Sequence, residues 1–178
     1  MIVIHPNDKA TSFLKAIYAG KRNVIIDETW SNRNIRECIG SSPSDEIIMM
    51  LGHGYRGGLF APSKISPYGR NIVDRKLVYL LKEHICIGIW DQANMFAKYN
   101  DLKGLFTGKL ILNKDTADSM GVDYEGEDIP LLNNQYASDL EYCIRNNDLP
   151  YVPQAMLNVQ DYSSDIKDFN YKSLYYYQ

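Results

Sequence analysis

The sequence predicts an α/β domain of three layers, in which helices cover both faces of a mostly parallel central sheet. Strand-like runs alternate with helix-like runs along the 178 residues. Several strand-like runs, among them EIIMML and ICIGIW, are continuously apolar, which is typical of strands covered on both faces. A chain of this length buries roughly 70% of its unfolded surface, so it needs neither disulfides nor metals to fold. We therefore expect one domain, with a tyrosine-rich tail from about residue 147.

The expected strands are short apolar or β-branched runs bounded by polar or turn-forming residues. Glycines after the third run flank two further short apolar stretches and predict a small hairpin excursion at the carboxyl end of that strand. We expect NVIID, EIIMML, ICIGIW and TGKLIL to belong to one sheet. The expected strands are 1–5, 23–27, 46–51, 85–90 and 107–112.

The expected helices carry apolar residues at three- and four-residue steps. Asn7 is expected to cap the first helix, which Gly20 is placed to end, and Asp74 is expected to cap a later one. The strongest amphipathic pattern lies between residues 129 and 144. The remainder is polar, weakly periodic and rich in tyrosine, a side chain amphipathic enough for either an extra strand or an interface.

Composition excludes several classes of protein. A formal net charge of −3 argues against a general nucleic-acid binder, which would carry a basic patch. No apolar run reaches the roughly 18 residues of a membrane-spanning helix, and the first residues lack the pattern of a signal peptide. Three widely spaced cysteines, Cys38, Cys86 and Cys143, make neither a disulfide framework nor a zinc site. We expect a reducing, cytoplasmic location and no cofactor.

Two strand ends carry polar residues suited to chemistry. Gly52-His53-Gly54 follows EIIMML, and Asp91 follows ICIGIW. Ligands of open α/β sheets bind outside the carboxyl ends of the strands. A histidine flanked by glycine N–H groups suits a general base beside an oxyanion hole, although glycines can simply make a turn around a loop histidine. Asp91 occupies the position of a nucleophile in many such folds, and its alternative role is a helix N-cap.

The other candidate groups are weaker. Cys86 alternates with isoleucines inside a buried strand, and Cys143 lies on the inward face of the late helix, so both are expected in the core. None of the cysteines has the exposed, electropositive surroundings of an activated thiolate. The acidic stretch 115–128 lacks the spacing of a calcium loop and is expected to be a solvated surface. The chain has no P-loop, GxGxxG, HExxH or GxSxG motif.

The order of these motifs resembles that of caspase-like (clan CD) cysteine peptidases, which include caspases, gingipains, separase and CHAT domains. The segment EIIMMLGHGYRGGLFAP resembles their histidine half, and HICIGIWDQANMFAKYNDLKGLFTGKLIL resembles their nucleophile half. The chain is most similar to small bacterial caspase-like proteins of the Bacteroidales type, in which an Ile-Trp-Cys-Asn-Ala-type motif precedes a Leu-Lys-Gly-x-x-(Thr/Ser)-Gly segment. The late helix and the ending FNYKSLY are also similar, so the resemblance spans nearly the whole chain.

The resemblance implies a role for three residues. His53 falls on the catalytic histidine, Gly54 on the glycine that supplies an oxyanion N–H, and Asp91 on the cysteine nucleophile. A carboxylate has low basicity and is the better leaving group from a tetrahedral adduct, so we expect no cysteine-type catalysis. His53 and Asp91 are expected on neighbouring strand ends, facing one cleft within about 10 Å of each other. There they can form an ion pair that stabilises the cleft.

Three functions follow from these residues. The first is a catalytically inactive caspase-like homologue that binds a peptide or protein partner in the former active-site cleft, with no nucleic acid or membrane involved. The second is a hydrolase in which His53 and Asp91 activate water or bind a metal, although catalytic zinc usually needs three protein ligands. The third is a small-molecule or nucleotide binder at the carboxyl edge of the sheet, for which no glycine-rich fingerprint is present.

Overall fold

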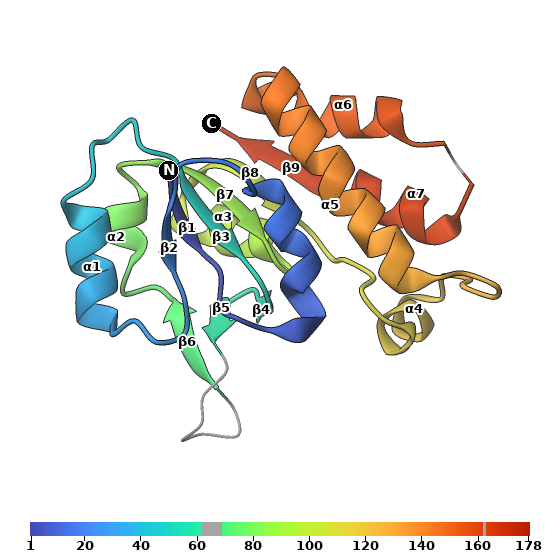
Figure 1. The fold of residues 1–178 in the computed structure, drawn as a ribbon, viewed down its shortest axis with the longest axis horizontal. Coiled ribbons are helices and arrows are strands. Elements are labelled where there is room, and N and C mark those ends of the chain that lie inside the picture. The colour runs from blue at the N-terminus through green and yellow to red at the C-terminus, as the bar shows by residue number, and fades with distance from the viewer. Residues whose placement is uncertain (62–68, 162) are drawn as a thin grey trace.

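The computed structural model describes residues 1–61, 69–161 and 163–178 and contains a six-stranded main sheet (Figure 1). The strand order is β2-β1-β3-β7-β8-β9. The first five strands run parallel, and β9 runs antiparallel to β8. The predicted α/β fold with a mostly parallel sheet is confirmed. The strands are β1 (Ile2–Ile4), β2 (Val24–Ile26), β3 (Ile48–Leu51), β7 (Ile85–Ile89), β8 (Lys103–Thr107) and β9 (Leu174–Tyr177).

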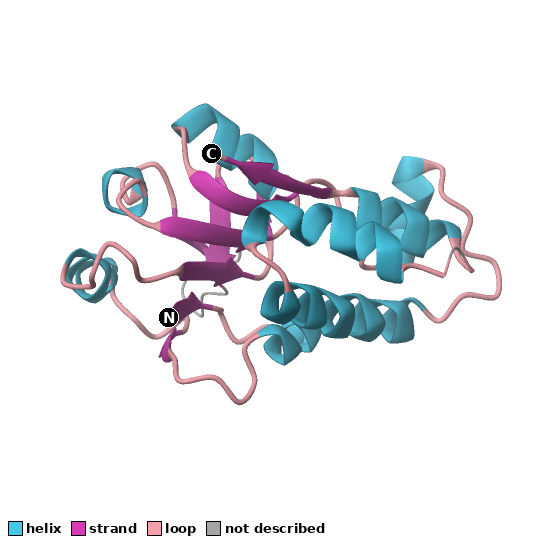
Figure 2. Cartoon of the chain, turned by 90° about the horizontal axis from the view of Figure 1, so that it is seen from above, coloured by secondary structure: helices cyan, strands magenta, loops and turns pink. Residues whose placement is uncertain are grey.

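Helices pack on both faces of this sheet (Figure 2). Because side chains alternate along a strand, Ile48 and Met50 of β3 belong to one core while Met49 and Leu51 belong to the other. The first core packs against α1 (Asn32–Gly40), α2 (Val78–Leu81) and α3 (Ala93–Asn100). The second packs against η1 (Lys9–Ile17), α5 (Ile129–Asn146), α6 (Val152–Val159) and α7 (Asp165–Lys172). The remaining helices are α4 (Lys114–Met120) and η2 (Leu149–Tyr151).

A second, antiparallel sheet follows β3 directly. It consists of β4 (Gly54–Tyr55), β5 (Gly58–Ala61) and β6 (Arg70–Val73), in that order. The hairpin excursion predicted from the glycines is therefore confirmed. Pro62, the last residue of the histidine-half segment, lies outside the described residues.

The predicted strand 107–112 is wrong, because the fifth parallel strand is β8, which ends where the prediction begins. Gly104 has a φ of +126°, and a Cβ there would lie 1.9 Å from the carbonyl oxygen of Cys86, so only glycine allows β8 to approach β7 this closely. Ile111 is buried outside any strand. Its N–H donates to Asn170 Oδ1 at 2.7 Å, and its carbonyl accepts from Asn170 Nδ2 at 3.1 Å. The backbone N–H and carbonyl of Ile111, which the sequence pattern assigned to a strand, are therefore hydrogen-bonded to the side-chain amide of Asn170 and not to a neighbouring strand.

Three predicted helix features differ in the structure. The first helix is a 3₁₀-helix, and its cap is Asp8, whose side chain accepts from Ala10 N, rather than Asn7. Asp74 is not a helix cap, because α2 begins later and Asp74 Oδ1 instead accepts from Lys76 N in the preceding turn. The tail beyond residue 147 is largely helical, and its last three tyrosines lie in the antiparallel edge strand β9. No helix in the described ranges combines the length and the apolarity required to cross a bilayer.

Candidate functional site

The parallel pairing of β3 with β7 brings the two polar strand ends to the same edge of the sheet. Leu51 pairs with Ile89, and the N–H of Gly52 donates to the Ile89 carbonyl at 3.1 Å. His53 and Asp91 each follow two residues beyond these paired positions. The expectation that they lie on neighbouring strand ends is confirmed.

The imidazole of His53 is paired with a carboxylate that the sequence did not suggest. Nε2 of His53 lies 3.0 Å from Asp8 Oδ2, and the His53 side chain is nearly half exposed. With Nε2–H donating to this carboxylate, Nδ1 is the acceptor nitrogen. A histidine oriented by a carboxylate is the arrangement of a general base in hydrolytic triads.

Asp8 is held by two contacts because it also begins the first helix. Its backbone is extended, its Oδ1 accepts from Ala10 N at 2.9 Å, and its Oδ2 is left to meet His53. The residue follows β1, which is the sheet neighbour of β3. Nothing in the local sequence pairs these residues, because the order of strands in a sheet is decided by long-range contacts. Asp8 is the site residue that the sequence interpretation missed.

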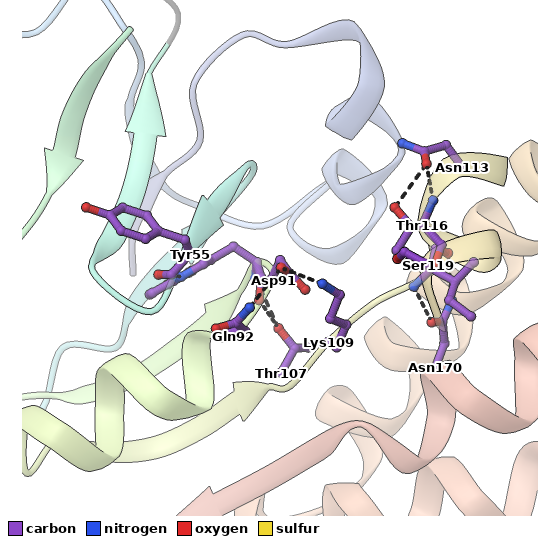
Figure 3. A network of polar contacts seen from close by, with 11 residues as sticks. Tyr55, Asp91, Gln92, Thr107, Lys109, Asn113, Thr116, Ser119 and Asn170 are labelled. Atoms are coloured by element: carbon purple, nitrogen blue, oxygen red, sulfur yellow. Dashed lines mark hydrogen bonds and ion pairs between the residues drawn. The ribbon is translucent and has the colours of Figure 1, made fainter. Parts of the chain in front are cut away.

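Asp91 forms its ion pair on the opposite side, toward β8 (Figure 3). Its Oδ2 lies 3.8 Å from Lys109 Nζ and 3.5 Å from Gln92 Nε2. Its Oδ1 is buried and has no hydrogen-bond partner among the described residues. The ion pair that the sequence allowed between His53 and Asp91 is therefore not among the ion pairs of the described residues. Each side chain pairs instead with a residue that follows the outer neighbouring strand, β1 for His53 and β8 for Asp91.

The alternative role of Asp91 as a helix cap is also wrong. The residue before α3 is Gln92, whose side chain makes no capping hydrogen bond. Gln92 adopts a left-handed conformation with φ of 64°, which is uncommon for a residue other than glycine. Its N–H donates to the Gly108 carbonyl at 2.9 Å, so the turn is tied to the end of β8. Strained residues of this kind cluster at functional sites.

Gly54 lies at a point where no side chain fits. A Cβ on Gly54 would lie 2.2 Å from Cδ1 of Trp90, whose indole N–H donates to the Tyr55 carbonyl at 3.1 Å. The N–H of Phe60 donates to the His53 carbonyl, so the next pair along this antiparallel ladder, Gly54 with Leu59, is a non-hydrogen-bonded pair. The N–H of Gly54 consequently points away from β5.

The cysteines lie away from this edge. Cys86 is fully buried and pairs with Ile48 at the opposite end of β3, and burial raises the pKa of its thiol to about 12. Cys143 is buried on α5, and burial, assisted by the charge of Asp139, raises its pKa to about 11. Burial also raises the pKa of Cys38 on α1. The prediction that Cys86 and Cys143 are core residues is confirmed.

No set of three or more His, Cys, Asp or Glu side chains within the described ranges is arranged to hold a metal ion. In the acidic stretch 115–128, Asp123 Oδ1 accepts from Glu125 N and Asp128 Oδ1 accepts from Leu131 N. These two carboxylates form a turn and a helix cap on the surface. Lys114, at the start of α4, lies 5.7 Å from the centre of the Tyr124 ring.

Comparison of the chain with models of protein families found no match. Neither the curated proteins nor the solved structures include a match to it. Because one fold supports many functions, the evidence for function lies in the residues at the carboxyl edge of the sheet.

Proposed function

We propose that this chain is a degenerate caspase-like peptidase homologue that binds a peptide at the carboxyl edge of its sheet and does not cleave it by thiol chemistry. The observation that carries the proposal is the register of β3 with β7, in which His53 and Asp91 follow the paired strand ends. The resemblance to clan CD places a histidine at the first position and a cysteine at the second. A carboxylate in the cysteine position removes the thiol nucleophile, whereas the histidine His53 and the glycine Gly54 are retained.

The environment of Asp91 supports an inactive site. A carboxylate attacks an amide poorly, because it leaves the tetrahedral adduct more readily than the amine does. The charge of Asp91 is also paired with Lys109. Cys86 cannot replace the missing thiol, since it lies near the start of β7, five residues before Asp91, or roughly 16 Å along an extended chain. Its buried thiol has a raised pKa and is therefore not a thiolate at neutral pH.

Other features support a cleft that still accepts an extended chain. The imidazole of His53 is oriented by Asp8, and the N–H of Gly54 points away from β5, toward a side where β4 has no strand neighbour in its sheet. A backbone N–H in this position can donate a hydrogen bond to a peptide carbonyl. Trp90 packs against Gly54 and ties the hairpin to the end of β7. These contacts hold the groups of a peptide site in fixed positions.

A second candidate function is supported by the His53–Asp8 pair. A histidine whose Nε2–H is held by a carboxylate can use Nδ1 as a general base toward water, so a hydrolase of an activated substrate is the alternative. Hydrolysis that is lost in both His53→Ala and Asp8→Asn, and retained in Asp91→Asn, would favour this alternative over a binding role.

The scaffold is tested by restoring a thiol. In Asp91→Cys we expect an iodoacetamide probe to label the introduced thiol at pH 7 at least about ten-fold faster than the thiol of Lys98→Cys, an exposed position on α3. A further His53→Ala should remove this advantage. Mass-spectrometric peptide mapping separates position 91 from the three native cysteines. Equal rates in Asp91→Cys with and without His53 would overturn the caspase-like interpretation of the site.

Peptide binding is tested by blocking the same position. Fluorescence polarisation with a panel of labelled, blocked decapeptides should detect ligands that bind wild type and are recovered uncleaved. Asp91→Cys modified with a bulky maleimide should lose this binding, and Lys98→Cys modified in the same way should keep it. Binding that survives the modification at position 91, or no binding by any peptide, would contradict the proposal.

A further inference from the structure

A cavity lies beside the hairpin, and its lining does not include Asp8, His53 or Asp91. It has a volume of about 580 Å³, within the range of small-molecule sites. Its walls come from the β4–β5 turn, from the segment that precedes α2 and from the exposed side of α3. The residues that line it are Tyr55, Arg56, Gly57, Asp74, Arg75, Lys76 and Tyr99.

The cavity is positively charged although the chain carries a net charge of −3. Three cations, Arg56, Arg75 and Lys76, face a single acid, Asp74. Among the described residues none of these cations forms an ion pair, and residues 62–68 and 162 contain no Asp or Glu. Two guanidinium groups on separate walls of one cavity suit a phosphate or another anion, which arginine binds with paired N–H donors.

The aromatic wall of the cavity is held in place. The Tyr55 ring stacks on Phe60 with a centroid distance of 5.0 Å and an interplanar angle of 6°. A Cβ on Gly57 would lie 2.5 Å from Cζ of Tyr55, so only glycine leaves room for the ring in this position. Tyr99 lines the same cavity and is 59% exposed. An ordered ring and an exposed ring offer stacking surfaces for a planar ligand at little entropic cost.

We propose that this cavity binds a nucleoside phosphate, with its phosphate at Arg56 and Arg75 and its base against Tyr55 or Tyr99. The combination of unpaired guanidinium groups with aromatic faces favours this class over a simple anion, because base–aromatic stacking adds affinity that phosphate contacts alone do not provide. The inference stands independently of the proposed peptide site, which lies at the strand ends. The cavity is linked to the proposed peptide site by one hydrogen bond. The Tyr55 carbonyl accepts from the indole N–H of Trp90, the residue before Asp91, so a ligand that moves Tyr55 also affects the surroundings of Asp91.

The test is isothermal titration of the full chain with AMP, GMP, adenosine and inorganic phosphate in low salt. We expect a mononucleotide to bind saturably, at least about ten-fold tighter than adenosine or phosphate alone, and to weaken as salt rises. The double variant Arg56→Gln/Arg75→Gln should bind at least about ten-fold more weakly. The matched control Arg22→Gln/Lys103→Gln removes the same charge from exposed positions next to the start of β2 and at the start of β8 and should bind as wild type does.

A second readout locates the ligand. In a ¹⁵N-labelled sample the indole N–H signal of Trp90 should shift on addition of the mononucleotide, while that of Trp30, the other tryptophan, should not. Tyr55→Leu should weaken binding, and Tyr99→Phe should preserve it because the ring remains. Absence of mononucleotide binding at millimolar concentration, equal binding by the double variant, or phosphate binding as tight as AMP would each overturn the proposal. Tighter binding of a phosphotyrosine peptide than of either mononucleotide would also overturn it.

Discussion

Nε2 of His53 lies 3.0 Å from Oδ2 of Asp8, a hydrogen bond that joins the residues following β1 and β3. Both side chains are partly exposed, so the pair adds little to the free energy of unfolding. The contact with Asp8 instead orients the His53 ring, because Asp8 is itself fixed by its hydrogen bond to Ala10 N. The ring of His53 is therefore presented at the sheet edge with one nitrogen occupied and the other available.

Replacement of Asp8 by Asn should slow the chemistry of a thiol introduced at position 91. Asn keeps an oxygen for Ala10 N and remains a good helix cap, but it removes the carboxylate charge beside His53 Nε2. In the Asp91→Cys background we expect iodoacetamide labelling to fall by about ten-fold or more. Peptide mapping measures the rate, and circular dichroism checks that the fold is unchanged. An unaltered rate would mean that Asp8 only caps the first helix.

Gly54→Ala should destabilise the protein because its Cβ would overlap the Trp90 ring and the Gly58 carbonyl, at 2.2 and 2.7 Å. We expect the free energy of unfolding to fall by about 1–3 kcal/mol, measured by urea denaturation. Gly40→Ala is the matched control, since its Cβ would meet only Leu80 Cδ2 at 3.4 Å at the end of α1. The control should be neutral or slightly stabilising. Equal losses in the two variants would contradict the close contact between the hairpin and β7.

Asn170→Ala should destabilise the protein, because the Asn170 side chain holds the segment that follows β8. The change removes both hydrogen bonds to the Ile111 backbone and leaves a buried N–H and a buried carbonyl unpaired. We expect a loss of about 2–4 kcal/mol in the free energy of unfolding. Asn146→Ala removes one hydrogen bond, to the Tyr142 carbonyl, from the exposed end of α5 and should change stability by less than about 1 kcal/mol. Similar losses in the two would show that Ile111 is satisfied in another way.

Stability should depend on pH through His5, which is buried after β1 with its Nδ1 3.0 Å from the Tyr18 hydroxyl. Burial, and secondly the charge of Lys15, lower the pKa of His5 from 6.5 to about 4. The unfolded chain therefore binds more protons between these values, and stability is lost as the pH falls from 6.5 toward 4. The expected loss from this group is about 3 kcal/mol.

The variants His5→Phe and Tyr18→Phe separate this contribution from the titration of carboxylates. His5→Phe should lose about 3 kcal/mol less than wild type between pH 7 and pH 4, since the titrating ring is absent. Tyr18→Phe retains the histidine and should keep most of the wild-type pH dependence. Urea denaturation at several pH values measures both. The same pH dependence in His5→Phe as in wild type would contradict a neutral, buried imidazole.

Local patterns were sufficient for much of the fold. EIIMML and ICIGIW are buried strands because continuous apolar runs of this length must be covered on both faces, and β3 and β7 lie within them. The glycines after residue 51 predicted the hairpin, because turns between short strands need residues of high conformational freedom. The amphipathic repeat 129–144 predicted α5 from its side-chain spacing alone. Each of these features depends on residues that are close together in the sequence.

Contacts between distant residues decided the rest. Periodicity assigned 107–112 to a strand, but Gly104 brings the preceding residues against β7, and Asn170 satisfies Ile111 from α7. The sequence by itself determined that His53 and Asp91 follow buried strands, because that depends on local pattern. Only the tertiary structure decided that His53 pairs with Asp8 and Asp91 with Lys109. The physical reason is that strand order, which local sequence does not encode, decides which side chains meet at the edge of a sheet.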